Sequence, residues 1–206
     1  MDIEIRNFIE ADIAGANRLE REAWPEDVQA SSEKLIDRYH TFAAGFFGAF
    51  SSNRLVGMAS SQIIIHPDES RLVSWAELTA DGWISKTHKA SGNCLHFVSI
   101  CVEPGIRHLG VATRLNEARL QAAYELGLKY ALTDTRLPGL RGYLEANPDV
   151  GPEQYIEDVI AGAASEPVVE MYLKFGFQAV GLIPNCMSAD AESSNYGLAM
   201  LKVLRP

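Results

Sequence analysis

The part of the sequence with the clearest chemical meaning is residues 102–115 (VEPGIRHLGVATRL). An apolar strand pattern ends there, a turn containing glycine follows, and a helical pattern begins near Gly110. This order points several backbone N–H groups and the positive end of the helix dipole toward one spot, where a pyrophosphate can be held. Gly110 lets the backbone approach the anion, Ala112 lets the helix start pack closely, and Arg107 can add a charge-assisted contact. The sequence therefore predicts an anion cradle at the start of this helix.

Alternating and helical patterns predict the elements that hold the cradle in place. Strand patterns cover residues 3–8, 46–50, 55–65, 95–102, 130–133, 177–183 and 196–204. Helical patterns cover residues 13–23, 31–42, 110–127, 153–160 and 167–175. Two stretches rich in proline and glycine, residues 66–92 and 137–164, are predicted to be insertions. Strands and helices alternate along the chain, which predicts a single α/β (α+β) domain over residues 1–206.

Composition excludes several classes of protein. With 206 residues, 47% hydrophobic and 22% charged, the chain has the balance of a globular domain. The net charge of −9 disfavours a nucleic-acid partner. The amino-terminal residues alternate apolar and charged side chains, so we expect neither a signal peptide nor a membrane span, and a cytoplasmic protein. Three cysteines (Cys94, Cys101 and Cys186) lack metal-type spacing and are expected to be free thiols, with no metal site.

Two motifs give the chain a family resemblance. Residues 107–112 (RHLGVA) match the R/Q-x-x-G-x-G/A signature of the GNAT (GCN5-related N-acetyltransferase) superfamily, and Pro104 stands in its customary place three residues earlier. Residues 170–177 (EMYLKFGF) resemble the later helix end of the same family. A narrower likeness links residues 74–79, 136–139, 151–155 and 195–197 to GNAT domains found fused to nitrilase-like amidohydrolases. The resemblance covers essentially the whole chain.

The resemblance implies a fold and a cosubstrate. It implies a mixed central sheet of about six to seven strands, flanked by helices and splayed between its fourth and fifth strands. Acetyl-coenzyme A would serve as acyl donor, with its pantetheine along the fourth strand at Ile100, Cys101 and Val102. The cradle residues implied to bind it are Arg107, His108, Leu109, Gly110, Val111, Ala112 and Thr113. The acceptor would be a primary amine of a small molecule or peptide that attacks the thioester directly, and a homodimer is one option for the assembly.

Candidate catalytic residues follow from the same comparison and from general acid–base chemistry. Tyr172 matches the family's helix tyrosine, which either protonates the leaving thiolate or only packs against the cofactor. His96 lies eleven residues before Arg107, where histone-acetylating relatives carry a glutamate base, but it can equally be a structural histidine of an apolar strand. Glu77 and Asp134 are alternative bases, and each can instead be a loop carboxylate or a helix cap. Cys101 is expected to be a buried small residue rather than a nucleophile.

Three functions are compatible with these residues. The main prediction is an N-acyltransferase that works through a ternary complex. A coenzyme A-binding module without transferase activity is the second. The third is a GNAT-fold enzyme that acts on the acyl group itself, such as a malonyl-coenzyme A decarboxylase. The two insertions are predicted to build the acceptor pocket.

Overall fold

The first half of the chain supplies four antiparallel strands and the two longer helices α1 and α2. The computed structural model describes residues 2–66, 72–187 and 190–204, so the predicted breaker Pro67 lies outside the described residues. The elements are β1 (Glu4–Asn7), α1 (Ile13–Ala23), α2 (Ser32–Phe42), β2 (Phe47–Ser51), β3 (Arg54–Ile64) and β4 (Cys94–Val102). Helix α2 begins where predicted because the Ser31 side chain accepts a hydrogen bond from the Lys34 backbone N–H at 3.4 Å.

The second half of the chain completes the sheet. Its elements are α4 (Val111–Glu125), β5 (Tyr130–Arg136), α7 (Pro167–Lys174), β6 (Gln178–Ile183) and β7 (Gly197–Val203). The seven strands lie in the order β1-β2-β3-β4-β5-β7-β6. All described pairs are antiparallel except β4 with β5. The predicted mixed sheet of six to seven strands, with helices on its faces, is confirmed.

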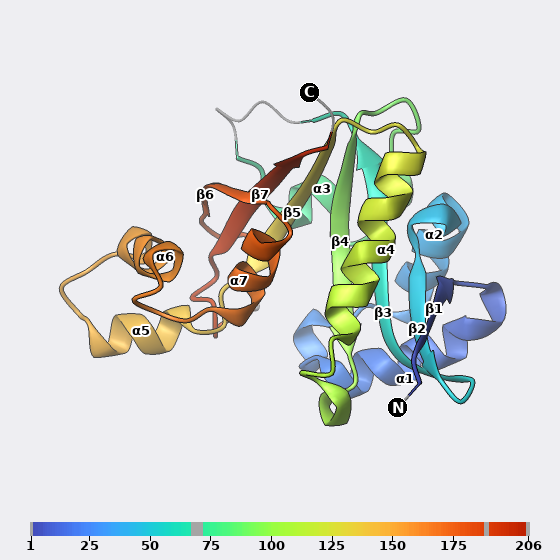
Figure 1. The fold of residues 1–206 in the computed structure, drawn as a ribbon, viewed down its shortest axis with the longest axis horizontal. Coiled ribbons are helices and arrows are strands. Elements are labelled where there is room, and N and C mark those ends of the chain that lie inside the picture. Colours follow the sequence, from blue (N-terminus) through green and yellow to red (C-terminus); the bar gives the residue numbers. More distant parts are fainter. Residues whose placement is uncertain (1, 67–71, 188–189, 205–206) are drawn as a thin grey trace.

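Each face of the sheet is covered by different helices (Figure 1). On one face, α4 packs Val111 and Leu115 against the first strands, and α7 packs Val169 and Tyr172 beside Phe97. On the other face, α1 and α2 bury Leu19 and Leu35 in a second cluster. Burial of these apolar side chains stabilises the two layers by roughly 1.5–3 kcal/mol for each large side chain.

The two predicted insertions contain short helices. Residues 66–92 contribute α3 (Trp75–Thr79), whose N-cap Ser74 accepts from the Glu77 backbone N–H at 3.2 Å. Residues 137–164 form α5 (Leu140–Ala146) and the expected α6 (Pro152–Ala161), which lie outside α7 at the left edge of Figure 1. Helix α5 was not predicted, because Gly142 lies in its interior and its seven residues are too few to show a clear periodicity. Packing of Tyr143 against Tyr155 on α6 holds it in place.

An ion pair between half-buried Arg136 and buried Asp190 fixes the loop between β6 and β7. Arg136 donates from Nε to Oδ2 of Asp190 at 2.7 Å and from Nη2 to Oδ1 at 2.5 Å. Ser193 Oγ donates to the same carboxylate at 2.6 Å and accepts from the Leu137 backbone N–H at 2.9 Å. Burial would raise the pKa of the Asp190 carboxyl, but the hydrogen bonds from Arg136 and Ser193 outweigh it and hold that pKa below its ordinary value.

We predict that Asp190→Asn destabilises the protein by about 2 kcal/mol at pH 7, because it removes the charge-assisted hydrogen bonds to the half-buried Arg136 guanidinium and leaves it only the exposed Glu192 as a counter-charge. A carboxyl whose pKa is lowered by folding stabilises the protein above its unfolded pKa of about 3.9, and this contribution is lost as pH falls through the folded pKa. The difference between wild type and variant should therefore shrink below pH 4. Urea unfolding at pH 7 and pH 3, with the exposed Asp149→Asn as control, measures both quantities. Equal losses for the two variants at pH 7 would contradict the prediction.

Candidate active site between the diverging strands

Strands β4 and β5 pair over only part of their length. Their parallel ladder runs from Cys94 opposite Tyr130 to Phe97 opposite Thr133, although β4 continues to Val102 and β5 to Arg136. A bulge begins at this point, because Ser60 and Ser61 on β3 lie opposite Ser99 and Phe97, which leaves Val98 as an extra residue. A bulge bends its strand and increases its twist. In Figure 1 the two ribbons run together near the C-terminus and diverge below it.

A cavity of about 310 Å³ occupies the region where the strands separate. Three helices form one side of its wall: the end of α1, the start and middle of α2, and α3. The bulge of β4, the end of β5, the middle of α4 and one turn of α7 form the rest. The residues used in the argument below are Trp24, Arg38, Trp75, Arg119, Asp134 and Tyr172. This volume lies at the small end of the range for small-molecule sites.

A fixed hydrogen-bond chain leads to Asp134. The Gln62 Nε2 group donates to the Leu78 carbonyl at 2.8 Å and to His96 Nδ1 at 3.1 Å. His96 Nδ1 accepts the hydrogen bond from Gln62 Nε2, so this ring nitrogen carries no proton. The proton of the neutral imidazole is therefore assigned to Nε2. His96 Nε2 therefore donates to Asp134 Oδ2 at 2.9 Å. Both ring nitrogens are engaged, and the His96 side chain is fully buried outside the cavity wall.

Asp134 itself faces the cavity. Its side chain is 1% exposed, and its Oδ1 atom has no hydrogen-bond partner among the described residues. A buried carboxylate oxygen without a donor is costly, so a ligand that supplies an N–H group there would be favoured. Asp134, the alternative base in the sequence analysis, thus lines the cavity, whereas His96 does not line it and contacts Asp134 from the protein interior.

Tyr172 and Arg119 form the opposite wall. Arg119 is fully buried, and its guanidinium carbon lies 3.8 Å from the centroid of the Phe97 ring. Its Nη2 group donates to the Tyr172 hydroxyl at 3.4 Å and to Asn116 Oδ1, and its Nη1 group donates to the carbonyl of Ser99 at 3.3 Å. Burial lowers the pKa of Arg119, although a guanidinium remains charged at neutral pH. Arg119 therefore ties Tyr172 to the bulge of β4.

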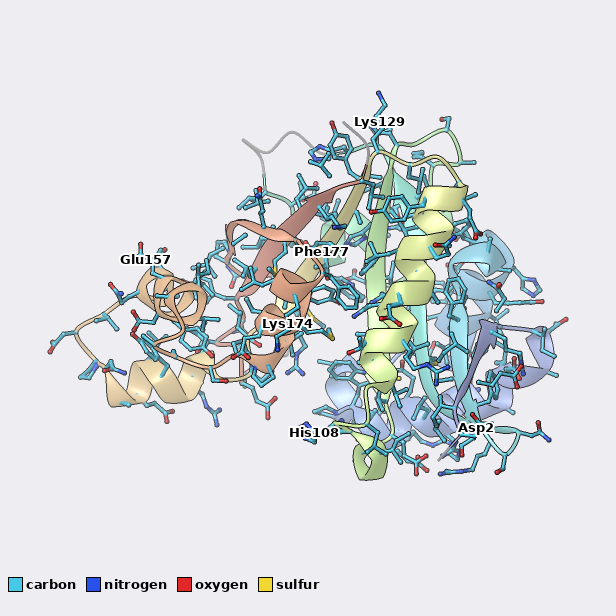
Figure 2. All side chains as sticks on the ribbon, viewed as in Figure 1. Asp2, His108, Lys129, Glu157, Lys174 and Phe177 are labelled. Carbon is cyan, nitrogen blue, oxygen red and sulfur yellow. The ribbon has the colours of Figure 1, made fainter. Side chains whose placement is uncertain are left out.

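The predicted cradle has the geometry of an anion site. Gly110 is the N-cap of α4 with φ 76°, a left-handed conformation, and no described side chain caps this helix end. The first backbone N–H groups of α4 consequently lack partners within the helix. Arg107 at this turn donates from Nη2 to the Ala23 carbonyl at 3.3 Å, and exposed His108 lies at the same end of α4 (Figure 2). These features fit a pyrophosphate held mainly by backbone donors.

The remaining predicted residues fall in different places. Ile100 and Val102 pack toward α4, whereas Cys101 is buried beneath α1, so a ligand along this edge would meet backbone rather than the thiol. Burial raises the pKa of Cys101 well above its ordinary value, which keeps it a thiol. Val111 is buried and Leu109 is 60% exposed. Glu77 is an exposed residue of α3 and does not line the cavity.

Among the residues of the cavity wall that sequence reasoning did not single out are Arg38, Arg119 and Trp24. A signal existed for Arg119, because it lies four residues after Leu115 on the apolar stripe of α4, where a charged side chain must be buried. Arg38 gives a similar signal three residues after Leu35 on α2. Trp24 follows the end of α1 and gives no comparable signal.

Two further findings concern the described part of the chain. It contains no helix that is both long and apolar enough to cross a bilayer. It also contains no cluster of three or more histidine, cysteine, aspartate or glutamate side chains suited to a metal ion.

Comparison with known proteins identifies the family. The sequence profile of the acetyltransferase (GNAT) family matches residues 13–143. An uncharacterized N-acetyltransferase of Bacillus subtilis, YkwB, is 30% identical over 202 residues, which cover 96% of this chain and 87% of that protein. The chain belongs to the GNAT family, and the predicted membership is confirmed.

Two other relatives show how far the likeness extends. The probable hydrolase YhcX of Bacillus subtilis is 29% identical over 196 residues, and the match spans 95% of this chain but 37% of that protein. Among solved structures, the GphF GNAT-like decarboxylase in complex with isobutyryl-CoA superimposes with a TM-score of 0.80 and 24% identity. That match covers 98% of this chain and 100% of that one, and it establishes the fold alone.

We predict that Gly110→Asp and Arg107→Ala both weaken binding of acetyl-coenzyme A, measured by titration calorimetry. The aspartate introduces a negative charge and a strained φ at the cradle, so a loss of at least tenfold is expected. Gly162→Asp is the matched control, because Gly162 has φ 75° and open space around it but lies at the end of α6. Unchanged affinity in both cradle variants would show that the phosphates bind elsewhere.

Proposed function

We propose that this protein is an N-acyltransferase that moves an acetyl or other short acyl group from acyl-coenzyme A to the primary amine of a small molecule. The observation that carries the proposal is the approach of Asp134 and Tyr172 to one cavity from opposite faces of the sheet. His96 and Phe97 are consecutive on β4 and so point to opposite faces. Asp134 bonds to His96, and Tyr172 packs near Phe97 with ring centroids 6.3 Å apart.

This arrangement supports a ternary complex. With its phosphates at the cradle of α4, the acyl-coenzyme A would lie along β4, whose backbone beyond Phe97 is not paired with β5. The thioester would then reach the bulge at Val98, where backbone N–H groups can stabilise the developing oxyanion. The amine would enter from the face of α1, α2 and α3. Donor and acceptor would thus meet where the strands separate.

In the proposed reaction, Asp134 Oδ1 accepts a hydrogen bond and then a proton from the acceptor ammonium. The amine nitrogen forms its bond to the thioester carbon, and the carbon–sulfur bond breaks. The departing thiolate takes a proton from the Tyr172 hydroxyl, and the resulting tyrosinate takes the second proton from the nitrogen, which becomes a neutral amide, while Asp134 releases the first proton to solvent. Arg119 supports this role, because its donation to the Tyr172 oxygen favours the partial negative charge that develops there. His96 acts as a positioning residue that fixes the Asp134 carboxylate.

A second candidate function is an enzyme that acts on the acyl group, such as a malonyl-coenzyme A decarboxylase. The observation in its favour is Arg119, a buried guanidinium in the cavity wall with no carboxylate within 4.0 Å among the described residues. Such a group could hold the carboxylate of a malonyl chain. The GNAT-like decarboxylase GphF shares this fold and supports keeping this candidate.

We predict that Asp134→Asn and Tyr172→Phe each lower kcat for acceptor-dependent thiol release by about 100-fold, since each removes one proton-transfer group. Affinity for acetyl-coenzyme A should stay within a few-fold of wild type, because both variants keep the shape of the side chain. Tyr143→Phe, which removes a hydroxyl contact to Asp158 on the distant α5–α6 lobe, is the control.

The same assays separate the candidate functions. Thiol release that requires an amine supports the transferase, and mass spectrometry of the acylated product confirms the new amide bond. Release of CO₂ from malonyl-coenzyme A without any amine would instead favour the decarboxylase. Binding of acetyl-coenzyme A with neither reaction, across an amine library, would favour a non-catalytic module and overturn the proposal.

A further inference from the structure

The acceptor half of the cavity contains a second buried cation that the proposed reaction does not use. Arg38 on α2 is 3% exposed and lines the cavity. Its Nε group donates to the Gly82 carbonyl at 3.2 Å, and its two Nη groups have no hydrogen-bond partner among the described residues. No described carboxylate lies within 4.0 Å of its guanidinium. A buried guanidinium in this condition is costly unless a ligand supplies an anion.

The chain around Gly82 is shaped to hold this cation. Ala80, Asp81 and Gly82 are three consecutive residues with positive φ, of 49°, 57° and 90°. Such a run is unfavourable outside glycine, and strained backbone of this kind tends to occur where a binding site requires it. A Cβ atom at Gly82 would lie 2.6 Å from Arg38 Nη2 and 3.4 Å from the Trp75 ring. Only glycine at this position therefore leaves room for both the Arg38 guanidinium and the Trp75 indole.

Other charges near the cavity do not remove the need for an anion at Arg38. The buried Glu20 attracts Arg38, but its Oε2 atom accepts from the Ala30 backbone N–H at 2.9 Å and its Oε1 atom has no partner. Burial raises the pKa of Glu20, which weakens it as a permanent counter-charge. Arg136 is already neutralised by Asp190 and Glu192. Lys34 and Asp81 add one further charge of each sign to the wall, and no ion pair within 4.0 Å joins Asp81 to Arg38 among the described residues.

The walls between the charged groups are aromatic. Trp75 is anchored by donation from its Nε1 to the Val98 carbonyl at 2.8 Å, next to the bulge. Trp24 lines the same cavity and packs under Arg136, whose guanidinium carbon is 5.1 Å from the ring centroid. These indoles add apolar surface to the cavity that Asp134 and Arg38 also line.

From this placement we propose that the acceptor is a small zwitterion of the α-amino-acid class, with its ammonium at Asp134 and its carboxylate at Arg38. The inference rests on the proposed function, because Asp134 is the group that receives the reacting amine. A cavity of about 310 Å³ suits a molecule of this size rather than a folded protein surface. The carboxylate would form charge-assisted hydrogen bonds to the Nη groups of Arg38.

The test compares acceptors that differ only in the carboxylate. Wild-type protein is assayed for thiol release from acetyl-coenzyme A with the twenty common L-amino acids, then with the amide and the decarboxylated amine of each acid that reacts. The acids should have kcat/KM at least about 30-fold above their amides and amines, because those analogues leave Arg38 buried and unpaired. Equal reactivity of the three, or a preference for diamines, would overturn this inference while the transferase function stood.

A variant series tests the assignment to Arg38. Arg38→Gln should raise KM for the acids and change kcat little. The ratio of kcat/KM for an acid to kcat/KM for its amide should fall close to one. Arg38→Lys should restore part of the ratio. Lys34→Gln is the matched control in the same wall, and loss of the ratio in that variant alone would assign the carboxylate to Lys34 instead. Calorimetry with acetyl-coenzyme A checks that each variant is folded. If a variant does not fold, the comparison of acceptors with the wild-type protein still tests the inference. Absence of thiol release with every acceptor would instead refute the proposed function.

Discussion

The separation of β4 from β5 is the constraint on which the rest of the molecule depends. Paired strands have no space between them, so a ligand can reach the middle of a sheet only where a ladder ends. Here the ladder stops at Phe97 and Thr133, and the bulge at Val98 turns β4 away. Because of this irregularity, the edge of β4 that faces β5 has no described strand partner beyond Phe97. The gap opens the cavity and lets groups from both faces of the sheet approach one point.

Several charged side chains near this point are buried with fewer partners than burial normally requires. Arg119 and Arg38 have no carboxylate within 4.0 Å among the described residues, and Asp134 has one oxygen without a donor. A core built only for stability would replace such groups by apolar ones, since removing a buried charge is often neutral or stabilising. Their presence in one cavity is best explained by ligands that bring the missing charges and hydrogen bonds. The Arg136–Asp190 pair, in contrast, is complete and belongs to the scaffold.

Family membership and chemistry rest on different kinds of evidence. The sequence profile and YkwB establish the GNAT family, and GphF shows that the same fold accompanies decarboxylase chemistry. A fold does not by itself select one reaction, because function depends on the side chains of the site. In this chain the distinguishing groups are the Gln62–His96–Asp134 hydrogen-bond chain on one face and the Arg119–Tyr172 contact on the other. In the proposed reaction, the first set removes a proton from the acceptor and the second protonates the leaving group.

The sequence by itself determined the family, the order of strands and helices, and the cradle, because these depend on local patterns such as the glycine-bearing turn before Val111. It also brought Tyr172, His96 and Asp134 forward as candidates. Only the tertiary structure shows that Asp134 lines the cavity and His96 does not, since His96 donates to Asp134 across 38 residues of sequence and is closed off by Gln62. Helix α5 and the cavity roles of Arg38 and Arg119 were likewise decided by packing. The physical reason is that burial and hydrogen-bond partners arise from contacts between distant segments, which a one-dimensional pattern does not contain.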